Sequence, residues 1–295
     1  MWRKDKMTQR NVKIGLIQMS CEENSERNIE KVINNIKSLA QQGANIICMQ
    51  ELFKNLYFCQ SEDHDNFALA EPVPGAGIDF LQELAKELDV VLIASLFESR
   101  APGVYHNTTA VIDAGGEYLG KYRKMHIPDD PNYYEKFYFT PGDLGYQVFA
   151  TKYGKIGTLI CWDQWYPEAA RLTALKGAEI IFYPTAIGWL AEDKEKLGEK
   201  QYNAWRSVQV GHAVANEVFI VTPNRVGHEG DIQFWGGSFV ADPFGELLFQ
   251  ASHDKEESAV VECDLSLIEE HRKAWPFLRD RRIDSYKNIL KRYDD

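Results

Sequence analysis

Apolar residues recur at every third or fourth position in several segments of the chain, which is typical of helices that bury one face. The clearest such segment spans residues 24–42, where Asn24 or Ser25 can cap a helix and Gly43 can end it. Its apolar positions are Ile29, Val32, Ile33, Ile36 and Leu39. We predict further helices over residues 77–88, 167–176 and 198–216.

Short apolar runs between these helices predict strands. Residues 90–96 are apolar almost throughout, as expected for a strand in a sheet that is covered on both faces. Strands alternate with helices early in the chain and follow one another late, which predicts a mixed α/β system. Residues 126–145 show little periodicity and form a loop long enough to suspect a function. The predicted strands are residues 12–18, 45–50, 90–96, 107–113, 117–122, 155–160, 179–183, 218–222, 237–241, 246–250 and 259–262.

Three residues with chemically active side chains stand where predicted strands end. Cys161 follows the run 155–160 and precedes a predicted turn and helix, the position at which open α/β sheets place their ligands. Glu51 and Lys124 end two other runs in the same way. Charged groups at the end of a buried strand are costly unless paired, so we expect the three residues to meet at one sheet edge. The simpler interpretation of Cys161 alone is a small buried apolar residue.

Composition and charge narrow the class of protein. The 295 residues contain no linker-like stretch, so a single domain is expected. The net charge of −11, without a basic run interleaved with aromatic residues, disfavours nucleic acid as a partner. An acidic chain is compatible with a cationic substrate, although acidity also serves solubility alone.

The cysteines and the N-terminal residues bear on location. The five cysteines are scattered and show neither C-x-x-C pairs nor zinc-type spacing with histidine, so we expect reduced thiols, no metal site and a cytoplasmic protein. Residues 1–10 are charged and precede no long apolar segment, and no stretch reaches membrane-spanning length. These residues are interpreted as a loose leader, with Met1 and Met7 both possible starts.

Three segments carry a resemblance to a known family. They are residues 134–142 (YEKFYFTPG), 161–171 (CWDQWYPEAAR) and 182–188 (FYPTAIG). Together with glutamate, lysine and cysteine in this chain order, they resemble the nitrilase superfamily of carbon–nitrogen hydrolases, and within it the N-carbamoylputrescine amidases. The resemblance extends from residues 12–18 to the tail around residues 281–282.

The resemblance implies a fold and an assembly. The implied fold is an α/β, four-layer αββα sandwich in which two sheets pack on each other and helices cover them, formed by a hydrolase domain of residues 11–275. Members of this superfamily pair their subunits through helices, which implies a homodimer or a larger homo-oligomer. Residues 276–295 are then a C-terminal arm that reaches the partner, and a solvated, frayed terminus is the alternative.

The resemblance also assigns catalytic roles. Cys161 is the nucleophile and Glu51 the base that takes its proton, since a thiol near its usual pKa is mostly neutral at pH 7. Lys124 and the backbone N–H of Trp162 stabilise the oxyanion. Glu135 is the second glutamate, which positions Lys124 and the attacking water. The chemistry needs no metal and no organic cofactor.

Each assignment has an alternative. Glu51 and Lys124 can form a structural ion pair, and Glu135 can be a surface carboxylate of its loop. His126 invites a Cys–His interpretation, although a loop histidine more often satisfies a local backbone group. Among functions, another amide or ureido hydrolase such as a β-ureidopropionase is the nearest alternative, and a catalytically silent metabolite-binding protein is the alternative of another class.

The substrate is inferred from the residues after the nucleophile. Carbamoylases that act on D-amino acids carry arginines there to bind a carboxylate, whereas this chain has Gln164 and Trp165. Together with Trp162 and Tyr134 these are the predicted substrate contacts. The resemblance therefore implies a carbamoylated amine, N-carbamoylputrescine, which is hydrolysed to putrescine, carbon dioxide and ammonia in polyamine biosynthesis. The charge run 192–195 is interpreted as a solvated helix face, and the alternative is that one of its acids reaches the substrate amine.

Overall fold

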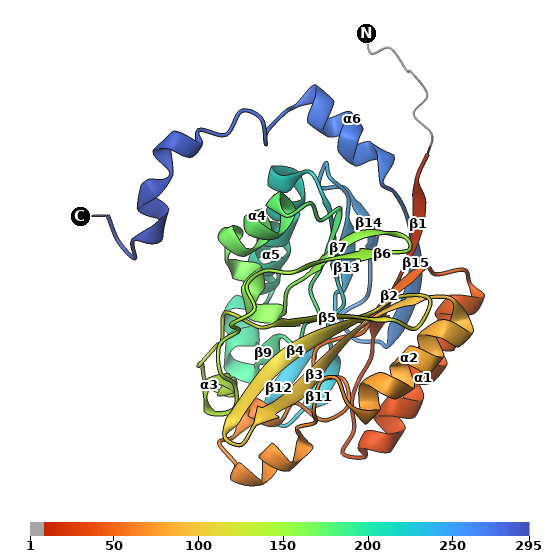
Figure 1. The fold of residues 1–295 in the computed structure, drawn as a ribbon. Helices are drawn as coiled ribbons and strands as arrows, with labels where there is room; N and C mark the ends of the chain where they lie inside the picture. The colour runs from red at the N-terminus through yellow and green to blue at the C-terminus, as the bar shows by residue number, and fades with distance from the viewer. Residues whose placement is uncertain (1–8, 295) are drawn as a thin grey trace.

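Four layers make up the computed structural model, which describes residues 9–294 (Figure 1). Helices α1 (Ser25–Gln41) and α2 (Ala76–Leu88) cover one sheet, a second sheet packs on its other face, and helices α4 (Pro167–Leu175) and α5 (Ala191–Asn216) cover the second sheet. The predicted αββα sandwich is therefore confirmed. The possible starts Met1 and Met7 lie outside the described residues.

Both large sheets contain three neighbouring parallel strands with antiparallel strands outside them. The first sheet has the order β15-β1-β2-β3-β4-β5 and the second the order β14-β13-β10-β8-β7-β6. The strands of the first sheet are β1 (Asn11–Gln18), β2 (Ile46–Cys48), β3 (Val91–Ala101), β4 (Val104–Ile112), β5 (Tyr118–Arg123) and β15 (Glu257–Asp264). Those of the second are β6 (Val148–Thr151), β7 (Gly154–Thr158), β8 (Ile180–Phe182), β10 (Phe219–Thr222), β13 (Phe239–Ala241) and β14 (Leu247–Gln250).

The apolar strands are explained by burial on both faces of each sheet. In β1, Ile14 and Leu16 belong to the core between the two sheets, where they are joined by Phe182 of β8. Ile17 of the same strand belongs instead to the core beneath the helices, with Ile36 of α1. A strand covered on both sides has no polar face, which is why these segments read as continuous apolar runs.

Of two predicted helices, α1 begins where the sequence predicts and α5 begins earlier. Helix α1 begins after Asn24, whose side chain accepts a hydrogen bond from the N–H of Arg27 at 3.2 Å, as the predicted cap requires. Helix α5 begins at Ala191 rather than at residue 198. Glu192 and Asp193 lie in its first turn, where negative charge is favoured by the helix dipole, so the charge run extends the helix.

Several elements were not predicted, and most of them are too brief to show a period. A third sheet has the order β11-β12-β9. Its strands are β9 (Gly188–Leu190), β11 (Val226–Glu229) and β12 (Ile232–Trp235). The remaining elements are α3 (Glu135–Tyr138), α6 (Ser266–Ala274) and the 3₁₀ helices Phe58–Gln60, His64–Leu69, Cys161–Trp165, Ile283–Ser285 and Lys287–Leu290.

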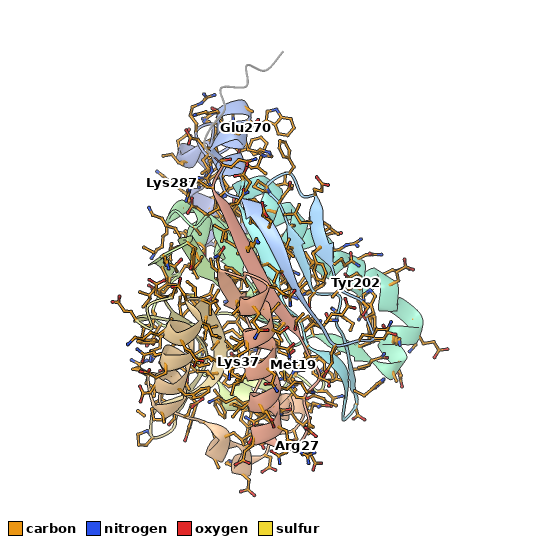
Figure 2. The ribbon with its side chains drawn as sticks, turned by 90° about the vertical axis from the view of Figure 1, so that its right-hand side faces the viewer. Met19, Arg27, Lys37, Tyr202, Glu270 and Lys287 are labelled. Carbon is orange, nitrogen blue, oxygen red and sulfur yellow. The ribbon has the colours of Figure 1, made fainter. Side chains whose placement is uncertain are left out.

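The C-terminal segment leaves the body of the molecule after α6 (Figure 1). Figure 2 shows Glu270 and Lys287 at the end of the molecule opposite to Arg27. The segment exposes large apolar side chains, among them Ile283 and Leu290. Its separation from the hydrolase domain at residue 275 remains a prediction.

Candidate active site

Three strand ends bring Glu51, Lys124 and Cys161 together. Glu51 follows β2, and Cys161 follows β7 and begins the 3₁₀ helix η3 (Cys161–Trp165). Lys124 follows β5, which runs in the same direction as β3 because two antiparallel pairings separate these strands. Strand β2 already ends at Cys48, so Glu51 lies in the turn after the strand rather than at its last position.

Lys124 is fully buried between two buried carboxylates, and we call Glu51, Lys124 and Glu135 the Lys124 cluster. Its Nζ lies 2.8 Å from Glu51 Oε1 and 2.6 Å from Glu135 Oε2. Tyr57 donates a hydrogen bond to Glu135 Oε1 at 2.7 Å, and Asn107 donates to Glu51 Oε1 at 2.8 Å. The other oxygen of Glu51, Oε2, is buried without a hydrogen-bond partner among the described residues. Glu51 therefore keeps one oxygen that can accept a proton.

The ratio of two carboxylates to one cation sets the pKa values of this cluster. Burial alone lowers the pKa of Lys124, but Glu135 and Glu51 outweigh burial and hold this pKa well above its usual value. Burial raises the pKa of Glu135, and the nearby charge of Glu51 raises it further. Lys124 lowers this pKa in part, and the result is about 7. Lys124 is thus held as an ammonium at neutral pH, and the Glu135 carboxyl binds a proton more readily than an exposed glutamate does.

Cys161 is held in an unusual backbone conformation at the start of η3. Its φ of 39° lies in the left-handed region, which costs energy for a residue other than glycine, and its side chain is buried. Burial and then Glu51 raise the pKa of the Cys161 thiol, Lys124 lowers it, and the result lies well above the usual value. The resting thiol is therefore neutral and needs a base when it attacks.

The loop after β8 joins the two sheets at the site. Pro184 O accepts a hydrogen bond from the Cys161 N–H at 3.0 Å, and Thr185 O accepts one from the Glu51 N–H at 3.4 Å. Ala186 O lies 3.9 Å from the Cys161 sulfur. Two residues that come from different sheets are thus positioned by one short loop.

Two buried residues that sequence reasoning missed hold Glu51 in place. Asn107 of β4 donates to the side chain, and the guanidinium of Arg225 donates to the main-chain oxygens of Glu51 and Leu52 at 3.1 and 2.9 Å. Arg225 also pairs with Glu229 at 2.7 Å. Asn107 could have been found, because an amide inside an apolar strand is costly without a partner. Nothing comparable marks Arg225.

Asp163 connects the Cys161 turn with the chain after β5. Its Oδ2 accepts hydrogen bonds from the Ile160 N–H at 2.9 Å and from the Tyr122 hydroxyl at 2.8 Å. Its Oδ1 accepts from the His126 N–H at 3.1 Å and lies 2.7 Å from His126 Nδ1. The His126 ring also stacks on Tyr166. His126 is therefore engaged with Asp163, which speaks against a Cys–His pair.

A cavity of about 430 Å³ opens onto Cys161 and Glu135. Trp162 and Trp165 line it, and their contact with a substrate remains a prediction. Its charged lining residues are all acidic, with neither lysine nor arginine among them. The lining consists of Pro128, Asp130, Pro131, Tyr133, Glu135, Cys161, Trp162, Trp165, Ile187, Gly188, Leu190, Asp193, Gln201, Ala204 and Trp235.

Two residues predicted as substrate contacts, Gln164 and Tyr134, are not among the residues that line this cavity. Gln164 is fully buried, where its amide donates to Thr185 Oγ1 at 2.6 Å and accepts from Trp205 Nε1 at 2.8 Å. Both ends of the amide are therefore used inside the protein. Tyr134 precedes α3, and its neighbour Tyr133 lines the cavity instead. Sequence adjacency placed both residues near the site but could not tell on which side of a turn each side chain lies.

Residues 9–294 show two absences. They contain no group of three or more His, Cys, Asp or Glu side chains that could hold a metal ion. Within the same range, no helix combines the length and apolar character that crossing a bilayer requires.

Known proteins resemble the chain over nearly its whole length. The chain is 47% identical to N-carbamoylputrescine amidase from Solanum lycopersicum, with 95% of each sequence covered. It is 38% identical to citrullinase from Francisella tularensis subsp. tularensis, with 96% of this chain and 99% of that protein covered.

A family model and a solved structure agree with these relatives. The crystal structure of a carbon-nitrogen hydrolase from Helicobacter pylori G27 shares 48% identity and superposes with a TM-score of 0.93, covering 96% of this chain and 100% of that one. Residues 13–273 match the family model described as carbon-nitrogen hydrolase. With a matching fold and a matching sequence over this range, the chain belongs to the carbon–nitrogen hydrolase family.

Proposed function

We propose that the protein hydrolyses N-carbamoylputrescine to putrescine, carbon dioxide and ammonia. The observation that carries this proposal is the cavity at Cys161, whose charged lining residues are acids without any lysine or arginine. Such a cavity favours a substrate with a cationic tail over one with a carboxylate, because a carboxylate would lose its hydration without gaining a partner. The 47% identity to a plant N-carbamoylputrescine amidase supports the same choice.

The Lys124 cluster can support both halves of the reaction. Glu51 takes the thiol proton while the sulfur of Cys161 attacks the ureido carbon, and the oxyanion forms on the Lys124 ammonium and the Trp162 N–H. The C–N bond to the terminal nitrogen breaks, Glu51 returns the proton, and ammonia leaves an S-carbamoyl intermediate on Cys161. Water that Glu51 activates and Glu135 positions then cleaves the thioester-like bond. The released carbamic acid loses carbon dioxide and yields putrescine.

The main rival is a hydrolase of ureido acids. A β-ureidopropionase from Arabidopsis thaliana is 30% identical to the chain, and the citrullinase is 38% identical. A substrate with a free carboxylate favours a guanidinium fork or an ammonium to bind it. The lining of this cavity includes no lysine or arginine, and the Lys124 ammonium at the reacting centre is already paired with Glu51 and Glu135, which favours the amine substrate.

Ammonia release from a substrate panel tests the proposal. We expect the specificity constant for N-carbamoylputrescine to exceed those for N-carbamoyl-β-alanine and N-carbamoyl-D-amino acids at least about 100-fold, as expected when a charged group enters a pocket without a partner. Comparable constants for amine and acid substrates would contradict the substrate assignment and leave the catalytic roles untouched.

The nucleophile has its own test. Cys161→Ala should abolish turnover, and rapid-quench mass spectrometry of the unaltered protein should show an adduct with the mass of the substrate less ammonia. Cys263→Ala is the matched control, since Cys263 is also a buried free thiol but lies in β15, away from the cavity lining. Turnover by Cys161→Ala above the trace level would refute the assignment.

The proposal extends to assembly and location. Exposed apolar side chains on the C-terminal segment, such as Ile283, Leu290 and Tyr293, support a homo-oligomer in which a partner covers them. Five free cysteines support a reducing compartment, hence the cytoplasm and a place in polyamine biosynthesis.

A further inference from the structure

Helix α5 lines the cavity with three residues, Asp193, Gln201 and Ala204, of which the first two are polar. Asp193 lies in the first turn of the helix, Gln201 lies eight residues further on, and both belong to the lining. At 1.5 Å of rise per residue, about 12 Å of helix axis separates them. The helix thus contributes two polar groups at different depths of the same cavity.

The part of α5 that follows Gln201 is held next to the nucleophile Cys161. Trp205 of α5 donates a hydrogen bond from Nε1 to Gln164 of η3, the short helix that Cys161 begins. Gln201 lies one turn before Trp205, and Asp193 lies two further turns away. Gln201 is therefore the nearer of the two to the reacting carbon, and Asp193 is the more distant.

Burial distinguishes Asp193 from the other acids of its charge run. Glu192 and Glu195 are exposed and do not line the cavity, whereas Asp193 is half-buried and does. Glu192 has its own contact with Lys196 at 3.5 Å. The neighbouring cation, Lys194, is directed to Gln233 at 2.6 Å and lies over the Trp189 ring, so it does not neutralise Asp193.

Unpaired polar atoms around the cavity show which groups remain to bind a substrate. Trp235 is buried, and its Nε1 has no acceptor among the described residues; the same holds for Trp165 Nε1. Gln201 Oε1 is a buried acceptor without a donor in the same range. An ammonium group only donates hydrogen bonds, so the indole N–H groups cannot hold it and an acceptor must.

We infer that Asp193 binds the distal ammonium of the substrate and that Gln201 Oε1 accepts an N–H of its ureido group. The inference rests on the proposed function and adds the residues that set its specificity. Six bonds join the ureido carbon to the terminal nitrogen of N-carbamoylputrescine, so the extended chain spans roughly 7.5 Å. That length suits two side chains that reach toward each other from points about 12 Å apart on one helix. The helix therefore selects both the charge and the length of the amine.

The test uses three ureas of equal chain length: N-carbamoylputrescine, neutral N-butylurea and anionic 4-ureidobutyrate. Asp193→Asn should lower the specificity constant for N-carbamoylputrescine roughly 30-fold, mainly through KM, as expected for a lost charge-assisted hydrogen bond. The constant for N-butylurea should stay within about twofold, since it lacks the ammonium. Gln201→Leu should lower the constants for both substrates by a similar factor, because both carry the ureido group.

Glu192→Gln is the matched control, because it removes an acid from the same turn that does not line the cavity. Equal effects of Asp193→Asn on N-carbamoylputrescine and N-butylurea would overturn the assignment of Asp193, as would a loss of selectivity confined to Asp130→Asn. A wild-type protein that prefers 4-ureidobutyrate would instead refute the proposed function. Thermal unfolding of every variant separates a binding defect from a folding defect.

Discussion

Two buried charge clusters adjoin along strand β5, and they combine carboxylates and cations in opposite proportions. In the first, which we call the Glu98 cluster, Glu98 of β3 receives hydrogen bonds from Lys121, Arg123 and Thr108. Both carboxylate oxygens are occupied. Burial alone would raise the pKa of Glu98, but Arg123, Lys121 and Thr108 outweigh it and hold the pKa at about 2.

The Lys124 cluster begins at the next residue and reverses this balance. One ammonium serves Glu51 and Glu135, one oxygen of Glu51 stays unpaired, and the pKa of Glu135 rises to about 7. A carboxylate with two cations is locked in its charged form, whereas two carboxylates around one cation retain a group that can take up a proton. The comparison teaches that the ratio of charges, more than their burial, separates a structural ion pair from a reactive one.

Exchanging lysine for arginine in each cluster should give the largest difference. Lys124→Arg keeps the charge but replaces a compact ammonium with a planar fork, and we expect turnover to fall about 100- to 1,000-fold if Nζ must face the oxyanion. Lys121→Arg, three residues earlier, should leave turnover within about twofold of the unaltered protein, because a guanidinium group can also donate hydrogen bonds to the Glu98 carboxylate. Steady-state kinetics on both variants decides this. A near-normal rate for Lys124→Arg would reduce Lys124 to a structural partner of Glu51.

Neutralising one carboxylate should lower stability more in the Glu98 cluster than in the Lys124 cluster, the reverse of the order expected for turnover. Glu98→Gln leaves Lys121 without its carboxylate partner and Arg123 with Asp143 alone, whose side chain is largely exposed, and we expect the free energy of unfolding to fall by about 3 kcal/mol. Glu51→Gln should cost less than half of this, because Glu135 still pairs with Lys124. Urea denaturation measures both. Equal losses for the two variants would show that the clusters do not differ in the way that their pKa values indicate.

The smallest expected effect is a difference in pH dependence. The pKa of Glu98 is lowered from 4.5 to about 2 by folding, so its stabilising contribution is present above about pH 4.5 and is lost as the pH falls toward 2. The pKa of Glu135 is raised from 4.5 to about 7, so its contribution is complete below about pH 4.5 and is lost as the pH rises through 7.

Unfolding free energies measured from about pH 3 to pH 8 resolve the two contributions. Glu98→Gln should flatten the acidic part of the profile only, and Glu135→Gln the part between about pH 5 and pH 8 only. A Glu135→Gln profile parallel to that of the unaltered protein throughout would contradict the raised pKa.

Much of this fold was predictable because its layers bury both faces of each sheet. Apolar runs such as residues 90–96 marked the strands, and Asn24 marked the start of α1. Three other runs, which lead into Glu51, Lys124 and Cys161, indicated a common sheet edge. The four-layer arrangement itself came from the resemblance, since periodicity shows that a strand is covered but not by what.

The unpredicted parts depend on contacts between segments distant in the chain. Gln164 follows Cys161 closely, yet its amide is used by Trp205 and Thr185, which no local pattern reveals. Asp193 reads as one acid in a charged run, and only the direction of α5 makes it a lining residue. The short strands of the third sheet carry too few residues for a period, although they supply Gly188 and Trp235 to the cavity.

The loop after β8 makes the catalytic geometry depend on how the two sheets pack together. Pro184 and Thr185 hold Cys161 and Glu51, which belong to different sheets, through two main-chain hydrogen bonds. A small displacement of one sheet relative to the other would increase the distance between the Cys161 sulfur and Glu51, while every helix and strand stayed intact. The catalytic rate therefore depends on how the two sheets pack against each other, which a measurement of secondary structure alone does not detect.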